Sequence, residues 1–236
     1  MTPARREDES SDWSSEGRED HYHSLANGLG RAAESGDTAL VERLLAEGAE
    51  VDEWVQGGRR ALDLAACAGH ADIVRLLLAA GADPRLVAGP YYESGHLSLA
   101  AMNGHTEVAR ALLDAGVDPD GPEGRLGHVP LVLAATSLDS GNPDLVDLLL
   151  DRGADIEERM KGCTALDWAA HWGFPVTVER LLARGAAVTK RTVREGRAGQ
   201  LRTAREGKGP GWPGPGPRSH DYRAVRALVL AAWESR

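Results

Sequence analysis

Two sets of glycines recur at nearly constant spacing along the chain, and this repetition constrains the fold more than any other feature. The first set interrupts an apolar pattern: Gly36, Gly69, Gly104, Gly141 and Gly173. The second set follows each of these 12 residues later: Gly48, Gly81, Gly116, Gly153 and Gly185. Successive units are offset by 33, 35, 37 and 32 residues. A period of this length is typical of proteins built from stacked repeats.

The segment 61–84, ALDLAACAGHADIVRLLLAAGADP, shows what one unit contains. Apolar residues at helical spacing predict a first helix over 61–68 and a second over 72–80. Gly69 separates the two helices, and Gly81 stands just after the second, where a left-handed backbone commonly ends a helix. Helices this short are marginal alone in water, so we expect each unit to pack against its neighbours.

The unit resembles the ankyrin repeat, a turn plus two helices with the pattern T-P-L-H-x-A. The match is best in TALDWAA at 164–170, and ALDLAA at 61–66, HLSLAA at 96–101 and PLVLAA at 130–135 follow it. The resemblance extends from Leu25 to Val188 and implies an all-α repeat solenoid. Its architecture is stacked helix-turn-helix ankyrin repeats with finger-like connecting turns. A tetratricopeptide array has longer helices and lacks the Gly-Ala-Asp exit seen at 81–83 and 153–155.

The domain organisation follows from these units. Residues 1–20 carry seven acidic residues and little that is apolar, which predicts a disordered acidic tail. Five repeats are expected at about 21–53, 54–86, 87–121, 122–158 and 159–189. We interpret residues 190–236 as a divergent basic capping repeat, with a helix over 221–233, a partner helix over 195–205 and a Pro/Gly-rich loop at 207–217.

The charge is unevenly distributed along the chain. Residues 21–189 have a net charge of −12, whereas residues 190–236 have a net charge of +7. An acidic repeat surface favours a protein partner with a basic surface. The basic segment could contact phosphate, but the acidic body opposes binding of nucleic acid.

Location is inferred from what the sequence lacks. No apolar run approaches the ~18–20 residues of a membrane span, and no signal-peptide pattern follows the first residue. Cys67 and Cys163 lie three repeats apart, so we expect two reduced thiols and a cytoplasmic protein. We also expect the protein to be a monomer. Arg outnumbers Lys 24 to 3, which suggests a GC-rich, bacterial coding sequence.

Motifs that carry catalytic or metal chemistry are not found in the sequence. It contains no phosphate-binding loop, no H-E-x-x-H, no C-x-x-C and no G-x-S-x-G. His70 and His105 fall at the family's Gly-His position, where the resemblance implies a structural role. Three other histidines with Glu93 or Asp167 could form a zinc or general-base site, but successive repeats lie too far apart to favour it. We therefore predict no catalytic residue, no metal and no cofactor.

Partner-binding candidates are the large or polar residues at positions that do not repeat. We call the glycine that separates the two helices of a repeat the break glycine. In ankyrin proteins the two residues before it face the concave groove, and here they include Met102-Asn103 and His171-Trp172. The connecting turns contribute further aromatic and basic residues, a class that dominates binding hot spots. The full candidate set is Trp54, Arg59, Tyr91, Tyr92, His96, Met102, Asn103, His128, His171 and Trp172.

Two functions remain open at this stage. The resemblance implies a non-enzymatic scaffold that binds a protein partner through its concave groove and finger tips. The alternative is a small-molecule-binding or catalytic repeat protein that uses a groove pocket lined by His, Tyr and Trp. The adjacent tyrosines at 91 and 92 can be a binding site or can simply pack on a neighbouring finger.

Overall fold

The computed structural model describes the backbone of residues 15–55, 58–86, 95–121, 128–138, 140–196 and 221–235, and within these ranges the side chains from residue 24 onward. The two tyrosines at 91 and 92 and the predicted loop at 207–217 lie outside the described residues.

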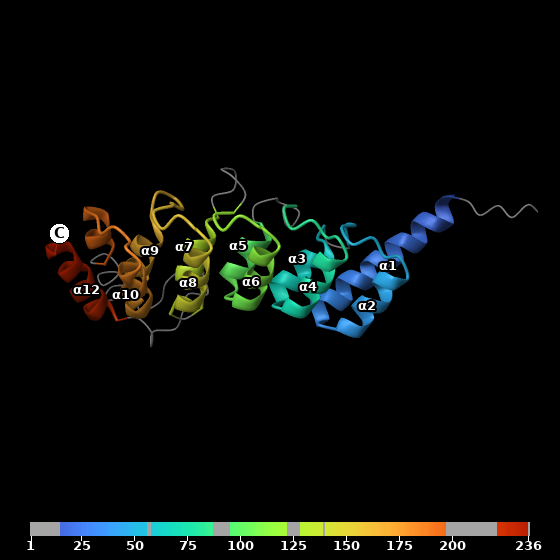
Figure 1. Ribbon diagram of the computed structural model, residues 1–236, viewed down its shortest axis with the longest axis horizontal. Helices are drawn as coiled ribbons and strands as arrows, with labels where there is room; N and C mark the ends of the chain where they lie inside the picture. Colours follow the sequence, from blue (N-terminus) through green and yellow to red (C-terminus); the bar gives the residue numbers. More distant parts are fainter. Residues whose placement is uncertain are drawn as a thin grey trace, which may run out of the picture.

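The described helices form pairs that stack in chain order along one direction (Figure 1). The pairs are α1 (Ser15–Ser35) with α2 (Thr38–Ala46), α3 (Ala61–Ala68) with α4 (Ala71–Ala79), α5 (His96–Met102) with α6 (Thr106–Asp114), α7 (Pro130–Thr136) with α8 (Pro143–Asp151), and α9 (Ala165–Trp172) with α10 (Pro175–Ala183). Residues 190–196 are also helical, and α12 (Tyr222–Glu234) is the last described helix.

Each helix packs against its counterpart in the next pair. First helices contact first helices from α1 through α9, and second helices contact second helices from α2 through α10 and on to α12. This arrangement confirms the all-helical solenoid expected from the repeats. The helices predicted at 61–68, 72–80 and 221–233 correspond to α3, α4 and α12, with ends shifted by no more than one residue.

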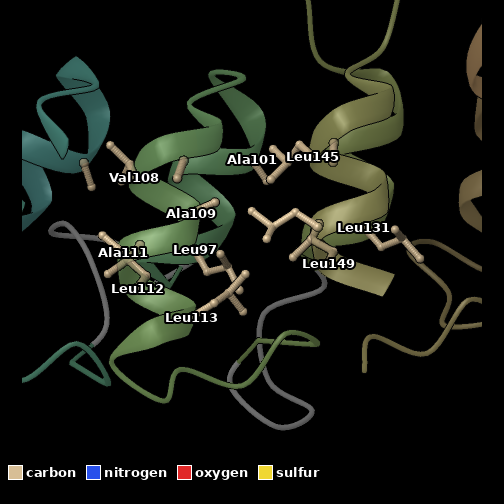
Figure 2. Packing of buried hydrophobic residues seen from close by; sticks show 14 of the residues in the cluster. Leu97, Ala101, Val108, Ala109, Ala111, Leu112, Leu113, Leu131, Leu145 and Leu149 are labelled. Atoms are coloured by element: carbon tan, nitrogen blue, oxygen red, sulfur yellow. The ribbon is translucent and has the colours of Figure 1, made fainter. Parts of the chain in front are cut away.

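Leucines from the second helices fill the space between the pairs. Figure 2 shows Leu145 and Leu149 of α8 extending toward the pair formed by α5 and α6. Both side chains are fully buried, as is Leu112 of α6. Each such leucine contributes roughly 1.5–3 kcal/mol by leaving water. Alanines such as Ala100 and Ala101 are fully buried in the first helices, where a small side chain lets neighbouring helices approach closely.

A histidine connects consecutive pairs at the turn between their helices. The Nε2 of His70 lies 3.1 Å from the carbonyl O of Glu34, and the Nε2 of His105 lies 3.0 Å from that of Cys67. Each ring also covers the break glycine of the preceding pair, Gly36 or Gly69, where φ is +82° or +85°. The structural role expected for these two histidines is therefore what the structure shows.

Both ends of the chain differ in part from what the sequence predicted. The first helix begins at Ser15, inside the range 1–20 that we expected to be disordered. The sequence there carries Glu16, Glu19 and Asp20, and acidic residues favour the N-terminal turns of a helix. The predicted helix at 195–205 instead begins at residue 190 and is described to residue 196.

The final helix packs on the fifth pair. It contacts α10 and α9, and the backbone N–H of Asp221 donates to the carbonyl O of Gly173 at 2.9 Å. The ring of Tyr222 covers Gly173 in the way that His105 covers Gly69. These contacts support a sixth, capping repeat, which stays a prediction.

Candidate interaction surface

The last residues of the first helices hold different side chains in each repeat, and their exposure also differs. Met102 is 45% exposed, and Asn103 beside it is exposed and donates from Nδ2 to the carbonyl O of Leu99 at 2.9 Å. His171 and Trp172 are half-buried. Ser137, at the position equivalent to Asn103 and Trp172, is buried instead. We call this series, from Glu34-Ser35 to His171-Trp172, the helix-end positions.

His171 is held between a carboxylate and two indole rings. Its Nδ1 lies 3.1 Å from Oε2 of Glu195, which comes from the following helical segment. The rings of Trp168 and Trp172 meet the imidazole edge to face, with centroids 5.9 and 5.5 Å away. Edge-to-face geometry is a favourable arrangement of aromatic rings. The side chains of the fifth pair and of the segment after it therefore form one preorganised aromatic cluster.

Trp168 anchors this cluster to the core. Its side chain packs against the core but stays partly exposed. Its indole N–H donates to the carbonyl O of Met160 at 3.2 Å. A tryptophan needs such an acceptor when its ring is largely buried, which explains why the ring sits at the margin of the core.

The connecting turn between α2 and α3, which we call the first finger, presents a tryptophan that packs against an arginine. Trp54 is 37% exposed, and the guanidinium carbon of Arg60 lies 3.7 Å from its ring centroid, a cation–π contact. Arg59 is exposed, and its Nη1 lies 3.8 Å from Sγ of Cys67. Two of the predicted candidates are thus at the surface and oriented by neighbouring side chains.

His96 was predicted as a surface candidate, and the structure corrects this. Its side chain is only 1% exposed. Nδ1 lies 3.0 Å from the carbonyl O of Pro84, and Nε2 lies 2.7 Å from Oδ1 of Asp63, which is equally buried. The other carboxylate oxygen of Asp63 accepts the backbone N–H of Arg60 at 2.7 Å. His96 therefore joins the second and third repeats and is not available to a partner.

The remaining finger candidates are less defined by contacts. His128 is half-exposed, and its carbonyl O accepts a hydrogen bond from Oγ of Ser98 at 2.9 Å. Tyr91 and Tyr92 lie outside the described residues, so their two interpretations both stay open.

Carboxylates connect successive fingers. Asp52 accepts the backbone N–H of Asp83 at 3.0 Å, and Asp120 accepts that of Asp155 at 2.8 Å. Glu157 accepts the N–H of Ala187 at 2.7 Å. The fingers thus carry negative charge that also fixes their spacing. Burial raises the pKa of Asp120 above its usual value, and the hydrogen bond from Asp155 opposes that effect.

Neither cysteine is activated by its surroundings. Both thiols are free, and burial raises the pKa of each above the ordinary value for cysteine. Nearby arginines, Arg59 beside Cys67 and Arg191 beside Cys163, oppose this shift without reversing it. A raised thiol pKa keeps the nucleophilic thiolate scarce at neutral pH.

Two searches of the described ranges bear on other functions. No three His, Cys, Asp or Glu side chains among these residues gather as a metal site would require. Within the same ranges, none of the helices combines the length and the apolar character needed to cross a bilayer.

The sequence did not indicate which side chains contact the candidate residue His171. Glu195 and Trp168 were not proposed as part of the site, although both contact or orient His171. Trp168 precedes His171 by three residues, about one turn of a helix, and this spacing was the available signal for their contact. Nothing in the sequence indicated Glu195, because it is 24 residues away and in a divergent segment.

Comparison with known proteins agrees with the helical repeats. A family model described as ankyrin repeats, in three copies, matches residues 19–88 and 97–192. No curated protein was found to match the sequence.

Proposed function

Because the chain belongs to the ankyrin-repeat family, whose repeats are generally protein-interaction modules, we propose that it is a non-enzymatic scaffold for one protein partner. The partner binds along the helix-end positions and the finger tips. The scaffold acts as a cytoplasmic monomer. Its two free, unactivated thiols support a reducing compartment.

The observation that carries this proposal is the contrast between repeated and unrepeated positions. Core positions hold leucine and alanine in every pair, whereas the helix-end positions hold Cys67, Met102, Thr136 and His171 in turn. The solenoid needs no particular side chain there, because these residues lie at or near the surface. Trp172 adds aromatic area that is only partly buried, and aromatic side chains are enriched in binding hot spots.

The charge of the fingers supports a partner with a basic surface. Asp118, Asp155 and Glu158 are exposed, and the repeats as a whole are acidic. Charges at the edge of an interface mainly raise the association rate and select partners of opposite charge, and they add less to the affinity. We therefore expect the association rate to fall as salt is raised.

A second candidate function rests on the Glu195–His171 pair. A carboxylate that fixes one imidazole nitrogen leaves the other for proton transfer, which is how a general base is oriented. Trp168 and Trp172 supply apolar walls beside it. A small molecule bound at this cluster would be the alternative to a protein partner.

The test uses a photo-crosslinking amino acid at position 103 in the full chain to capture the partner in cells. The captured protein is then purified, and its affinity for the wild type and for Trp172→Ala is measured. We expect Trp172→Ala to weaken binding by about tenfold or more, with a melting temperature close to that of the wild type. Arg43→Ala, on the exposed side of α2, is the matched control and should bind as the wild type does.

The outcomes separate the two candidates. A partner that binds Trp172→Ala and the wild type equally would place the interface elsewhere and contradict the proposal. Loss of a heat signal for a metabolite mixture in Glu195→Gln, with unchanged protein binding, would favour the small-molecule candidate instead.

A further inference from the structure

Three exposed apolar side chains lie along one edge of the solenoid, at the turns between first and second helices. Met102 is 45% exposed, Leu138 is 58% exposed and Val176 is 55% exposed. Among the described residues, the one other large apolar side chain with comparable exposure is Trp54, in the first finger. Single exposed apolar residues are ordinary, but a contiguous group marks an interaction site.

The contacts of the fourth repeat bring the turns that carry these three residues next to one another. The side chain of Leu138 covers Gly104, because a Cβ on that glycine would lie 2.9 Å from its Cγ. Gly104 is two residues from Met102. On the other side, Thr177 donates from Oγ1 to the carbonyl O of Ser140 at 2.9 Å, which brings α10 and Val176 to the same turn. The group thus spans the third, fourth and fifth repeats.

The turn between α7 and α8 in the fourth repeat, which is longer than the turn between α5 and α6, creates this edge. In the second and third repeats one histidine both covers a glycine and bonds the preceding pair. Here the two tasks are divided: Leu138 covers Gly104, and Asn142 donates from Nδ2 to the carbonyl O of Gly104 at 3.1 Å. Leu138 adopts φ +57°, a conformation that a bulky residue rarely takes. An apolar group therefore stands where the second and third repeats present an imidazole.

Val176 departs from its own repeat position in the same way. The equivalent residues in α4, α6 and α8 are Asp72, Glu107 and Asp144, all exposed and in the first helical turn. An acid is favoured there because it lies at the N-terminus of a helix. A valine side chain has no charge to interact with the helix N-terminus, and more than half of its surface is exposed to water.

The charges around this edge are predominantly negative. Asp144, on the adjacent helix, and Glu179, one turn from Val176, are both exposed. The neighbouring arginines already have carboxylate partners: Arg75 and Arg110 pair with Glu107, and Arg180 pairs with Asp147. Exposed Arg223 occupies the equivalent position on α12 and limits the acidic region at that end. Apolar side chains bordered by carboxylates complement a segment with apolar and basic faces.

We propose that the edge formed by Met102, Leu138 and Val176 docks a basic amphipathic segment of a partner protein. The inference rests on the proposed scaffold function and adds a second contact surface, which shares only Met102 with the helix-end positions. The apolar face of the segment covers the three side chains, and its Lys or Arg residues meet Asp144 and Glu179. This is a helix-on-surface mode of recognition.

The experiment uses three synthetic peptides of about four helical turns, roughly 14 residues. The first places Leu on one face and Lys on the other. The second has the same Leu pattern with Glu in place of Lys, and the third has the Leu/Lys composition in scrambled order. Binding to the full chain is measured by fluorescence anisotropy, and resonance shifts of backbone amides locate the bound peptide.

Val176→Asp and Ala39→Asp are the matched pair of variants. Ala39 is the exposed equivalent of Val176 in the first repeat, so both substitutions add one negative charge at the same helical position. Added charge alone would strengthen attraction of a basic peptide in both variants. If the apolar contact carries the binding, Val176→Asp should weaken the amphipathic Leu/Lys peptide by about tenfold, whereas Ala39→Asp should not weaken it.

Several outcomes would overturn the proposal. One is that the amphipathic Leu/Lys peptide binds the wild type no better than the scrambled peptide does. A second is that the amphipathic Leu/Lys peptide binds Val176→Asp as tightly as the wild type. Another is self-association in sedimentation that Val176→Asp abolishes, because a second copy of the chain would then cover the edge. Loss of peptide binding in Trp172→Ala but not in Val176→Asp would place the peptide at the helix-end positions. That result would leave the proposed function intact and this edge unused.

Discussion

The imidazole of His105 covers Gly69 of the preceding repeat so closely that a Cβ on that glycine would lie 2.7 Å from the ring carbon Cε1. The same ring places Nε2 3.0 Å from the carbonyl O of Cys67. One glycine therefore meets two demands: its own φ of +85° and contact with the next repeat. The conformational demand and the packing demand can be separated experimentally.

Gly69→Ala should be more destabilising than Gly81→Ala. Both glycines have positive φ, but nothing lies within 4 Å of a Cβ at Gly81. Gly81→Ala should cost about 1–2 kcal/mol for the left-handed backbone alone. Gly69→Ala should cost more, and adding His105→Ala should recover the excess in a double-mutant cycle measured by urea unfolding. Equal effects of the two glycine substitutions would show that the ring contact is not restrictive.

Removing His96 should destabilise the protein strongly. His96→Ala leaves the buried carboxylate of Asp63 without the imidazole 2.7 Å away, and breaking a buried pair typically costs about 3–5 kcal/mol. Asp63→Ala with His96→Ala should cost less than the sum of the two single changes. The free energies of unfolding by urea provide the measurement. Strict additivity would mean that the two side chains do not interact.

Leu77→Ala should weaken more than its own repeat. Leu77 is fully buried in α4, and truncation should cost roughly 2–5 kcal/mol through lost burial and a cavity. Stability in stacked repeats is shared between neighbours, so hydrogen exchange should accelerate in α2 and α6 as well as in α4. Exchange that changes in α4 alone would contradict this coupling.

Asp120→Asn should change stability in a pH-dependent way. Burial raises the pKa of Asp120 in the folded state, so its stabilising contribution is present below the unfolded pKa and lost as pH rises through the folded pKa. The asparagine oxygen can still accept from the N–H of Asp155. We expect the variant to equal or exceed wild-type stability at pH 7, by up to ~0.5 kcal/mol, and to lose that advantage near pH 4. Melting temperatures across this range check the sign, and a destabilised variant at pH 7 that recovers in acid would refute it.

Truncation after Val188 should expose apolar surface. The described part of the removed segment includes Val225 and Val229, which are buried in the core cluster, and α12 packs on α10. We expect a lower melting temperature and stronger binding of an environment-sensitive dye, because terminal repeats shield the stack from water. A truncated protein that stays monomeric and equally stable would show that residues 190–236 do not cap the solenoid.

The sequence by itself determined the helix pairs of the internal repeats and their order. The boundaries of α3, for example, follow from local spacing of Leu62, Leu64 and Ala65 and from the glycine at position 69. His70 and His105 were also assigned correctly, because their role repeats with the same spacing as the glycines. Such features depend on neighbours in the chain or on periodicity, and both are visible in one dimension.

Only the tertiary structure decided which unrepeated side chains reach the surface. His96 and Met102 belong to the same helix and both departed from the repeat pattern, yet one is buried against Asp63 and the other is exposed. The difference comes from the layer on either side, which supplies a carboxylate in one case and no cover in the other. Glu195 beside His171, and Leu138 over Gly104, depend in the same way on contacts between repeats. Burial and charge pairing depend on atoms that are distant in sequence, so composition and periodicity do not predict them.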